Sequence, residues 1–219
     1  MKTLIIQPRY LPSFEFINRL KKVDVVVFLD NTVIDHRDYE NRTKVRCNDI
    51  DKWLTIPVTK KEKIQHVRIT DQFIDEHRNK VKEYYGESSE LFDFLVPMHN
   101  ENYIQFMHEH YDRLFRYIGK KAYLLNRSEI VTGDITGKEE IKQILKEIDA
   151  TEYYTGDNCL AYGLDQEFLN DIYVKLELFN FEERFNSYRQ CFDLDARYSI
   201  VDTEMVKKQE LKNKTIDEN

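Results

Sequence analysis

Cysteine is scarce in this sequence. The 219 residues contain three cysteines, Cys47, Cys159 and Cys191, which lie far apart and form no CxxC pair or Cys/His cluster. This spacing argues against a structural zinc site, and we expect no bound metal. Free thiols in a reducing compartment are the simplest interpretation of the three cysteines.

Long apolar runs and phosphate-binding glycine motifs are also missing. No apolar stretch approaches the roughly 20 residues that a membrane helix needs, and the apolar run at the N-terminus is too short for a signal peptide. We therefore expect a cytoplasmic, soluble protein without membrane insertion. The chain has six glycines and neither GxGxxG nor GxxxxGK[ST], so neither a dinucleotide fingerprint nor a P-loop is indicated.

Positive charge is in deficit, and aromatic residues are abundant. The 33 lysines and arginines against 40 acidic residues give a net charge of -7. Sequence-independent nucleic-acid binding depends on cations that neutralise phosphates, so we expect no nucleic-acid partner. Aromatic residues make up 13% of the chain, mostly 14 tyrosines and 13 phenylalanines, which argues against disorder and for a sizeable core.

The order of the predicted elements near the N-terminus indicates an α/β fold. Apolar runs at 4–6 and 23–29 are typical of buried strands. The amphipathic segment between them, which ends at about Lys22, predicts a helix, and strand–helix–strand units of this kind hold their strands parallel. Residues 43–47 and 53–58 alternate between polar and apolar and predict a β-hairpin.

A helical block and a second α/β stretch follow the hairpin. We predict a short strand at 67–69, helices at 75–84, 89–95, 103–117, 135–148 and 165–169, and strands at 121–125, 151–155 and 173–179. The fold we expect is a mostly parallel Rossmann-like sheet with a β-hairpin insertion and a central helical block at about 73–118. A single domain would cover residues 1–202, with a charged, mobile tail at 203–219.

Polar residues follow the first two predicted strands. Gln7 and Tyr10 lie in the turn after the first strand, Asp30 ends the second, and Asn41 and Arg42 close the next loop. Open α/β sheets bind ligands at the carboxyl edge, where these residues would meet. Gln7 and Tyr10 could orient a ligand and Arg42 could clamp a phosphate or carboxylate. Proline turns and a strand-end carboxylate also have ordinary structural explanations.

Two residues are candidates for general acid–base chemistry. Asp30 is favoured by its place at a strand end, and His36 has Asp35 and Asp38 nearby, although a loop histidine is more often simply exposed. In the turn after the strand at 151–155, Gly156 would let the backbone approach a ligand. His108 and His110 point apart on a helix and cannot chelate one metal.

Taken together, these stretches resemble the WbqC-like family. The likeness rests on residues 5–12, 23–31, 41–42, 53–58, 151–156, 188–190 and 198–202, and covers nearly the whole chain up to Asp202. It implies functional or motif residues at Gln7, Pro8, Tyr10, Asp30, Asn41, Arg42, Gly156, Tyr188, Gln190, Ser199 and Asp202. This chain departs from the pattern at Asn31, where the family often has a second acidic residue.

The resemblance implies a role in bacterial O-antigen or other surface-polysaccharide biosynthesis. We expect a transferase acting on an amino sugar or nucleotide sugar, with transfer of an acyl or aminoacyl group as our hypothesis. Two alternatives stay open: a non-catalytic nucleotide-sugar-binding or scaffold protein, and a divergent nucleotidylyltransferase-like enzyme without the HxGH signature. The substrate-binding residues would include Tyr188 and Gln190. The cofactor, a carrier-protein donor and a homodimer also stay open.

Overall fold

The computed structural model describes residues 1–12, 14–35, 38–47, 50–58, 61–85, 94–95 and 101–179. This part of the chain forms a five-stranded sheet of order β5-β2-β1-β6-β7 and a two-stranded sheet, β3-β4. The large sheet is parallel and consists of β1 (Lys2–Ile6), β2 (Val25–Phe28), β5 (Tyr123–Asn126), β6 (Glu152–Gly156) and β7 (Lys175–Phe179). The small sheet is an antiparallel hairpin of β3 (Arg42–Cys47) and β4 (Ile50–Thr55). The predicted α/β fold with a hairpin insertion is confirmed.

The sheet has a topological switch point at its centre. From β1 the chain passes through α1 (Phe14–Leu20) to β2 and later to β5, and it then crosses to β6 and β7 on the other side of β1. The connections therefore leave β1 and β6 in opposite directions. Open α/β sheets bind ligands in the crevice that this arrangement leaves at the carboxyl ends of the strands.

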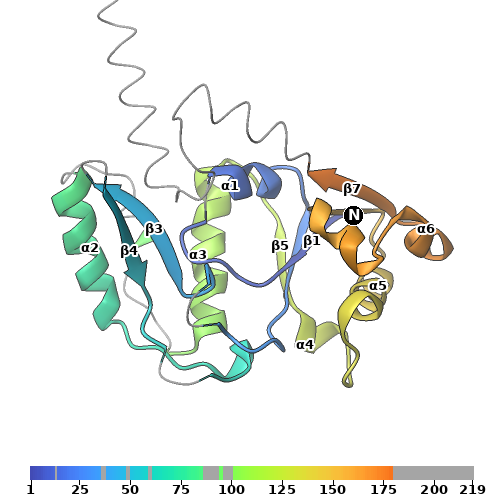
Figure 1. Ribbon diagram of the computed structural model, residues 1–219, viewed down its shortest axis with the longest axis horizontal. Helices are drawn as coiled ribbons and strands as arrows, with labels where there is room; N and C mark the ends of the chain where they lie inside the picture. The colour runs from blue at the N-terminus through green and yellow to red at the C-terminus, as the bar shows by residue number, and fades with distance from the viewer. Residues whose placement is uncertain are drawn as a thin grey trace, which may run out of the picture.

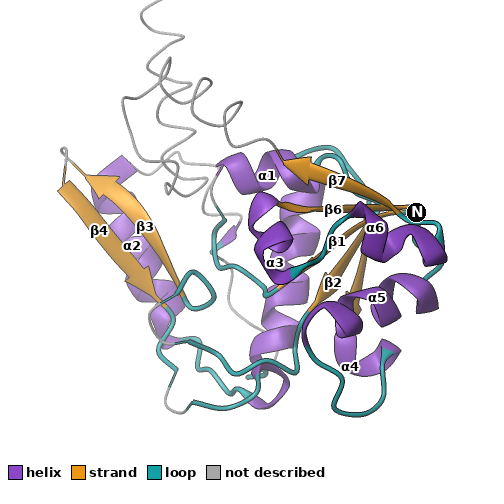
Figure 2. Cartoon of the chain, turned by 45° about the vertical axis from the view of Figure 1, so that its right-hand side comes forward, coloured by secondary structure: helices purple, strands orange, loops and turns teal. Residues whose placement is uncertain are grey.

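Helices cover both faces of the parallel sheet. One face packs on α1, on α3 (Tyr103–Tyr117) and, farther out, on α2 (Gln72–Tyr85) and the hairpin. The opposite face packs on α5 (Gly137–Glu147) and α6 (Gln166–Leu169). Because successive side chains of a strand point to opposite faces, the all-apolar β2 is buried on both sides. Figures 1 and 2 show the hairpin and α2 at one end of the molecule and α5 and α6 at the other.

The helix α3 spans the predicted residues because its start is capped. The Asn102 side chain accepts hydrogen bonds from the backbone N–H groups of Ile104 and Gln105, at 3.0 and 3.3 Å. The capped helix then buries one face against the sheet, so its central residues Met107 and Tyr111 are fully enclosed.

Two predictions about strands need correction. The strand β4 starts earlier than predicted and ends at Thr55, before Pro57, which has no N–H to donate. The predicted strand at 67–69 is not a strand: it has an isolated bridge between Arg68 and Asn102 and follows a short 3-10 helix, η1 (Ile64–His66). Its apolar alternation reflects the burial of Val67 and Ile69 without a strand partner.

Some predictions fall outside the described residues. These include most of the helix predicted at 89–95 and the whole segment after Phe179, with the proposed tail at 203–219. Among the described helices, none combines the length and apolar character needed to cross a membrane.

Candidate functional site

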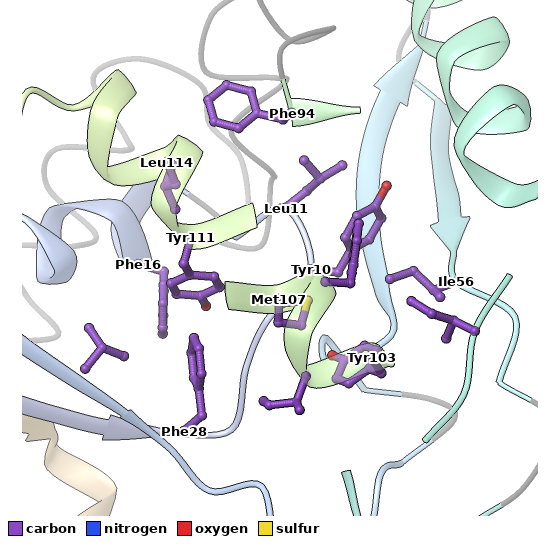
Figure 3. Packing of buried hydrophobic residues seen from close by; sticks show 14 of the residues in the cluster. Tyr10, Leu11, Phe16, Phe28, Ile56, Phe94, Tyr103, Met107, Tyr111 and Leu114 are labelled. Atoms are coloured by element: carbon purple, nitrogen blue, oxygen red, sulfur yellow. The ribbon is translucent and has the colours of Figure 1, made fainter. Parts of the chain in front are cut away.

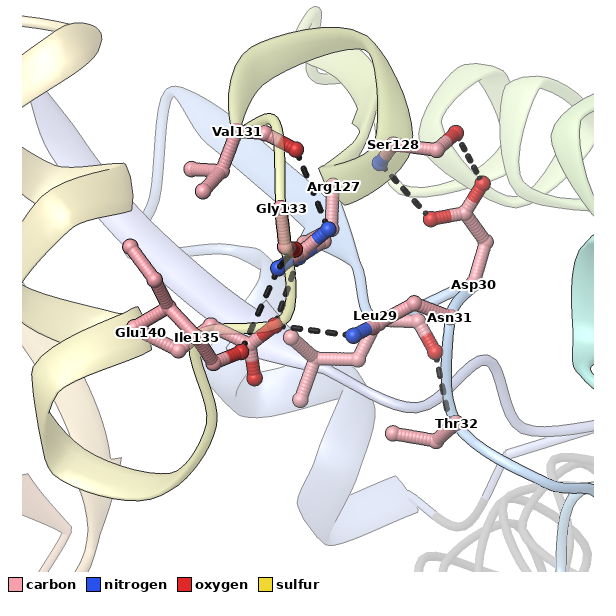
Figure 4. A network of polar contacts seen from close by, with 10 residues as sticks. All are labelled: Leu29, Asp30, Asn31, Thr32, Arg127, Ser128, Val131, Gly133, Ile135 and Glu140. Atoms are coloured by element: carbon pink, nitrogen blue, oxygen red, sulfur yellow. Dashed lines mark hydrogen bonds and ion pairs between the residues drawn. The ribbon is translucent and has the colours of Figure 1, made fainter.

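The loops after β1 and β2 are joined by side chains at the carboxyl edge of the sheet. The Gln7 Nε2 amide donates to Thr32 Oγ1 at 3.2 Å. The Thr32 hydroxyl donates to the Leu29 carbonyl at 2.8 Å (Figure 4). Since β1 and β2 are parallel neighbours, Gln7 and Asp30 lie at the same edge, as the sequence predicts.

Asp30 holds the start of α4 (Arg127–Ile130), the helix that follows β5. Its Oδ1 accepts from the Ser128 backbone N–H at 2.9 Å and its Oδ2 accepts from the Ser128 hydroxyl at 2.5 Å (Figure 4). Asp30 is 1% exposed, whereas Ser128 is exposed. Any chemistry of the Asp30 carboxylate on a ligand would therefore pass through the Ser128 hydroxyl.

A buried ion pair lies directly behind this edge. The Arg127 Nε donates to Glu140 Oε1 at 2.5 Å, and both side chains are 7% exposed. The remaining guanidinium N–H groups donate to the carbonyls of Val131, Gly133 and Ile135. A buried charge is tolerated when it is paired and hydrogen-bonded in this way, so this network fixes the loop between α4 and α5.

Asn31 joins the ion pair to the sheet edge. Its Nδ2 donates to Glu140 Oε1 at 2.8 Å (Figure 4). Its Oδ1 is buried and receives no hydrogen bond from the described residues. Buried polar atoms are normally paired, so Asn31 Oδ1 is a buried acceptor that lacks a donor among the described residues.

Tyr10 points into the core instead of toward the sheet edge. It is fully buried in the core (Figure 3). Its hydroxyl is hydrogen-bonded to His77 Nδ1 at 2.7 Å, and its ring packs against Phe73 and Phe106. Burial raises the pKa of Tyr10 well above its usual value and lowers the pKa of His77 to about 4. This placement favours a packing role for Tyr10 over the predicted contact with a ligand.

Asn41 and Arg42 have different surroundings, although they are neighbours in sequence. Asn41 is 2% exposed, and its Nδ2 donates to the Ile56 carbonyl at 3.1 Å, across the base of the hairpin. The Arg42 guanidinium lies over the Trp53 ring, with Cζ 4.1 Å from the ring centroid. Arg42 therefore belongs to the hairpin surface, and Asn41 to its interior.

Gly156 ends β6, next to β1 at the switch point. Its backbone is extended, with φ -79° and ψ 158°, a conformation open to any residue. A Cβ atom at this position would lie 3.8 Å from Arg19 Nη1, which is an ordinary van der Waals distance. Neither backbone conformation nor space requires glycine here. A role in ligand approach stays a prediction.

Three predicted site residues, His36, Tyr188 and Gln190, lie outside the described residues. Within the described ranges, no group of three His, Cys, Asp or Glu side chains is placed to hold a metal ion.

His108 is a candidate site residue that the sequence did not indicate. Its Nε2 is 2.7 Å from Asn126 Oδ1 at the end of β5, and Asn126 Nδ2 donates to Glu129 Oε1 at 3.1 Å. Since a carboxylate only accepts, Asn126 must turn its oxygen to His108, so His108 Nε2 carries a proton and donates it to Asn126 Oδ1. The helical spacing of His108 and His110 does not predict these hydrogen bonds, because Asn126 and Glu129 come from β5 and α4.

Glu40 is a second missed residue. It is 4% exposed, its Oε2 accepts from the Asp35 backbone N–H at 2.6 Å, and burial raises the pKa of its carboxyl to about 7. A carboxyl that titrates near neutral pH can exchange protons under physiological conditions. Glu40 lies in a polar loop, and nothing in that stretch of sequence predicts that its side chain is buried.

Comparisons with known proteins agree with the sequence resemblance. The profile of the WbqC-like protein family matches residues 7–214. The chain is 24% identical over 220 residues to "Uncharacterized protein Rv1507c" of Mycobacterium tuberculosis (strain ATCC 25618 / H37Rv), a match that covers 92% of this chain and 91% of that protein. No solved structure matches the chain significantly. On the extent of the family match, this chain belongs to the WbqC-like protein family.

Proposed function

We propose that this protein is a transferase of bacterial sugar or surface-polysaccharide biosynthesis that acts on an amino sugar or nucleotide sugar. The observation that carries the proposal is the group of polar side chains at the carboxyl ends of β1, β2 and β5: Gln7, Asp30, Asn31 and Ser128. An amino sugar offers hydroxyl and ammonium donors, and the amide, carboxylate and hydroxyl oxygens of these four side chains are acceptors. Family membership agrees with this reading but leaves the chemistry open.

In the proposed reaction, Asp30 acts as general base through Ser128. The acceptor hydroxyl or ammonium group gives a proton to Ser128 Oγ, while the Ser128 proton moves to Asp30 Oδ2 along the existing hydrogen bond. The freed acceptor lone pair then attacks the carbonyl carbon of the acyl or aminoacyl donor. The bond between this carbon and the donor's carrier group breaks, and the carrier leaves with the proton held on Asp30. Gln7 would orient the acceptor from its place beside Thr32.

Other predicted residues keep proposed roles around this centre. Arg42 would bind an anionic part of the substrate from the hairpin, and Gly156 would border the sugar at the switch point. Tyr188 and Gln190 would add substrate contacts, and His36 is a second candidate for the base. Tyr10 would support the site by packing beneath the loop that carries Gln7.

The test compares turnover and binding in Asp30→Asn. The variant is assayed with a panel of nucleotide amino sugars and acyl or aminoacyl donors, and ligand affinity is measured separately. We expect turnover to fall about a hundredfold or more, with affinity nearly unchanged, and Ser128→Ala to behave in the same way. The exposed Asp134→Asn serves as the matched control. Wild-type turnover by Asp30→Asn would remove the base role.

A second function, a non-catalytic nucleotide-sugar-binding or scaffold protein, is favoured by one observation. Both Asp30 oxygens already accept from Ser128, and the side chain is 1% exposed. A binding protein would gain thermal stability with a nucleotide sugar, by about 2.7 kcal/mol at a hundred times the dissociation constant. It would show no turnover with any donor in the panel.

A further inference from the structure

Three cations and two aromatic rings form a continuous surface on the hairpin and the loop after β1. We call Arg9, Tyr39, Arg42, Lys44 and Trp53 the cation–aromatic surface. Arg9 Cζ lies 5.9 Å from the Tyr39 ring centroid, and the Tyr39 and Trp53 rings are 5.9 Å apart. Arg42 Cζ and Lys44 Nζ lie 4.1 and 5.6 Å from the Trp53 centroid. Tyr39 therefore neighbours both Arg9 and Trp53, and Trp53 neighbours both Arg42 and Lys44.

The alternation of the hairpin strands explains why these residues share one face. Arg42 and Lys44 are two apart on β3, and Lys44 pairs directly with Trp53 on β4. Thr43, between Arg42 and Lys44 on β3, and Leu54, next to Trp53 on β4, are 1% and 0% exposed and face the core. Trp53, in contrast, is 38% exposed. The outer face of the hairpin thus presents the only tryptophan of the sequence together with two cations.

The surface gathers three cations in a chain with a net charge of -7, and Arg42 and Lys44 also have further interactions within the protein. Like charges repel, and this gathering of positive charge is suited to an anionic ligand. Stacking on an aromatic ring uses the flat face of the Arg42 guanidinium, while its N–H donors lie in the plane, where phosphate oxygens are recognised. Aromatic rings in turn stack on nucleobases. The surface therefore combines the two chemistries that a nucleotide presents.

The cation–aromatic surface adjoins the carboxyl edge of the sheet. Arg9 follows Gln7 and Pro8 directly after β1. The Tyr10 backbone N–H donates to the Tyr39 carbonyl at 3.0 Å, and the Thr43 hydroxyl donates to the Leu11 carbonyl at 3.0 Å. Figure 1 shows this loop passing between the parallel sheet and the hairpin. A ligand on the surface could extend from Arg9 toward Gln7 and Asn31.

We propose that the cation–aromatic surface binds the nucleoside diphosphate part of a nucleotide sugar. The base stacks on the exposed side of the Tyr39 and Trp53 pair, and Arg9, Arg42 and Lys44 neutralise the diphosphate. The sugar then extends toward the carboxyl edge. This inference rests on the proposed function, because it names the half of the substrate that lies away from the reacting atoms.

Trp53 makes the proposal directly testable, since its fluorescence reports from the surface without interference from another tryptophan. The full chain is titrated with UDP, ADP, uridine and pyrophosphate at low and high salt. We expect both nucleoside diphosphates to quench Trp53, to bind at least about tenfold more tightly than uridine or pyrophosphate, and to weaken as salt rises. Equal binding of pyrophosphate and UDP, equal binding of uridine and UDP, or no quenching by any probe would overturn the proposal.

Variants measured by calorimetry separate stacking from charge. Arg9→Ala and Trp53→Ala should each weaken UDP binding about tenfold, and Arg9→Lys should weaken it less because it keeps the charge. Lys146→Ala, an exposed cation on α5 across the sheet, is the matched control and should bind as the wild type does. Far-ultraviolet circular dichroism confirms that each variant is folded. Wild-type affinity in both Arg9→Ala and Trp53→Ala would overturn the proposal.

The two proposals fail in different ways. If UDP binds at Trp53 and no nucleotide sugar is turned over, the surface stands and the transferase does not. If a nucleotide sugar is turned over with the same KM by wild type, Arg9→Ala and Trp53→Ala, the transferase stands and the surface is not its nucleotide site.

Discussion

Arg127 and Glu140 illustrate how much depends on single residues behind the sheet edge. Their side chains are 7% exposed, and together with Asn31 they connect β2, α4 and α5. Removing one partner of a buried ion pair strongly lowers the stability of the protein, because the remaining charge stays buried without compensation. The position of Asn31 at the proposed site therefore depends on both charges.

The change Glu140→Gln tests this dependence. It preserves the size of the side chain and removes its charge, so the Arg127 guanidinium is left unpaired, and we expect a loss of about 3–5 kcal/mol in the free energy of unfolding. Urea denaturation at neutral pH measures it. Glu139→Gln, an exposed position in the same helix turn, should change stability by less than about 0.5 kcal/mol. Similar losses in both variants would contradict the structure.

At the scale of elements, the loop after β1 is held by two side chains of α3. The Arg9 N–H donates to the Tyr111 hydroxyl at 3.1 Å and the Leu11 N–H donates to His110 Nε2 at 3.3 Å, both on α3. Leu11 has φ 42°, in the left-handed region that a branched side chain rarely adopts. These hydrogen bonds hold the strained turn, which in turn sets where Gln7 and Arg9 lie.

Tyr10→Phe tests the link from this loop to α2. The ring still fills the core, but His77 Nδ1 loses its hydrogen-bond partner inside the protein, so we expect a loss of about 1–3 kcal/mol in the free energy of unfolding. Urea denaturation gives the magnitude, and hydrogen exchange should show faster opening of the backbone around 10–11 than in wild type. If Tyr10 instead contacts the ligand, UDP-sugar binding would weaken while stability stays unchanged.

The stability of the whole molecule should depend on pH through groups buried in its core. Burial lowers the pKa of His77 to about 4 and that of His110 to about 3, so the unfolded chain, with a usual value of 6.5, takes up protons first. Their contribution to stability is full above about pH 6.5 and is lost as pH falls toward these values. Glu40 has the opposite sign: its pKa is raised to about 7, so its contribution is lost as pH rises from 4.5 through 7.

As pH falls from 6.5 to 5, the two histidines lower the free energy of unfolding and the one glutamate raises it. The two histidines outweigh the glutamate, so the free energy of unfolding should fall over this range. His110→Gln keeps an acceptor for the Leu11 N–H but cannot be protonated. We expect its pH dependence to be shallower than that of wild type by about 1.4 kcal/mol per pH unit. Urea denaturation at several pH values measures the slope. An unchanged slope would mean that His110 is not held neutral in the folded protein.

Local sequence signals were enough to predict most elements and the parallel pairing of the first two strands. The apolar runs of β1 and β2 and the helical period of α3 follow from which residues must avoid water, and each is read within one short segment. A helix between two buried strands also fixes the parallel pairing of β1 and β2. Gln7 and Asp30 were correctly placed at one edge for the same reason.

The partners of the site residues come from distant segments, which is why the folded chain alone reveals them. Asp30 and Ser128 are 98 residues apart, and Tyr10 and His77 are 67 apart. No spacing rule links such pairs, because their contact depends on which side chains converge after the elements have packed. The motif containing Gln7 and Tyr10 could thus be recognised in the sequence, while the direction of Tyr10, toward the core, was set by α2 and α3 closing over it.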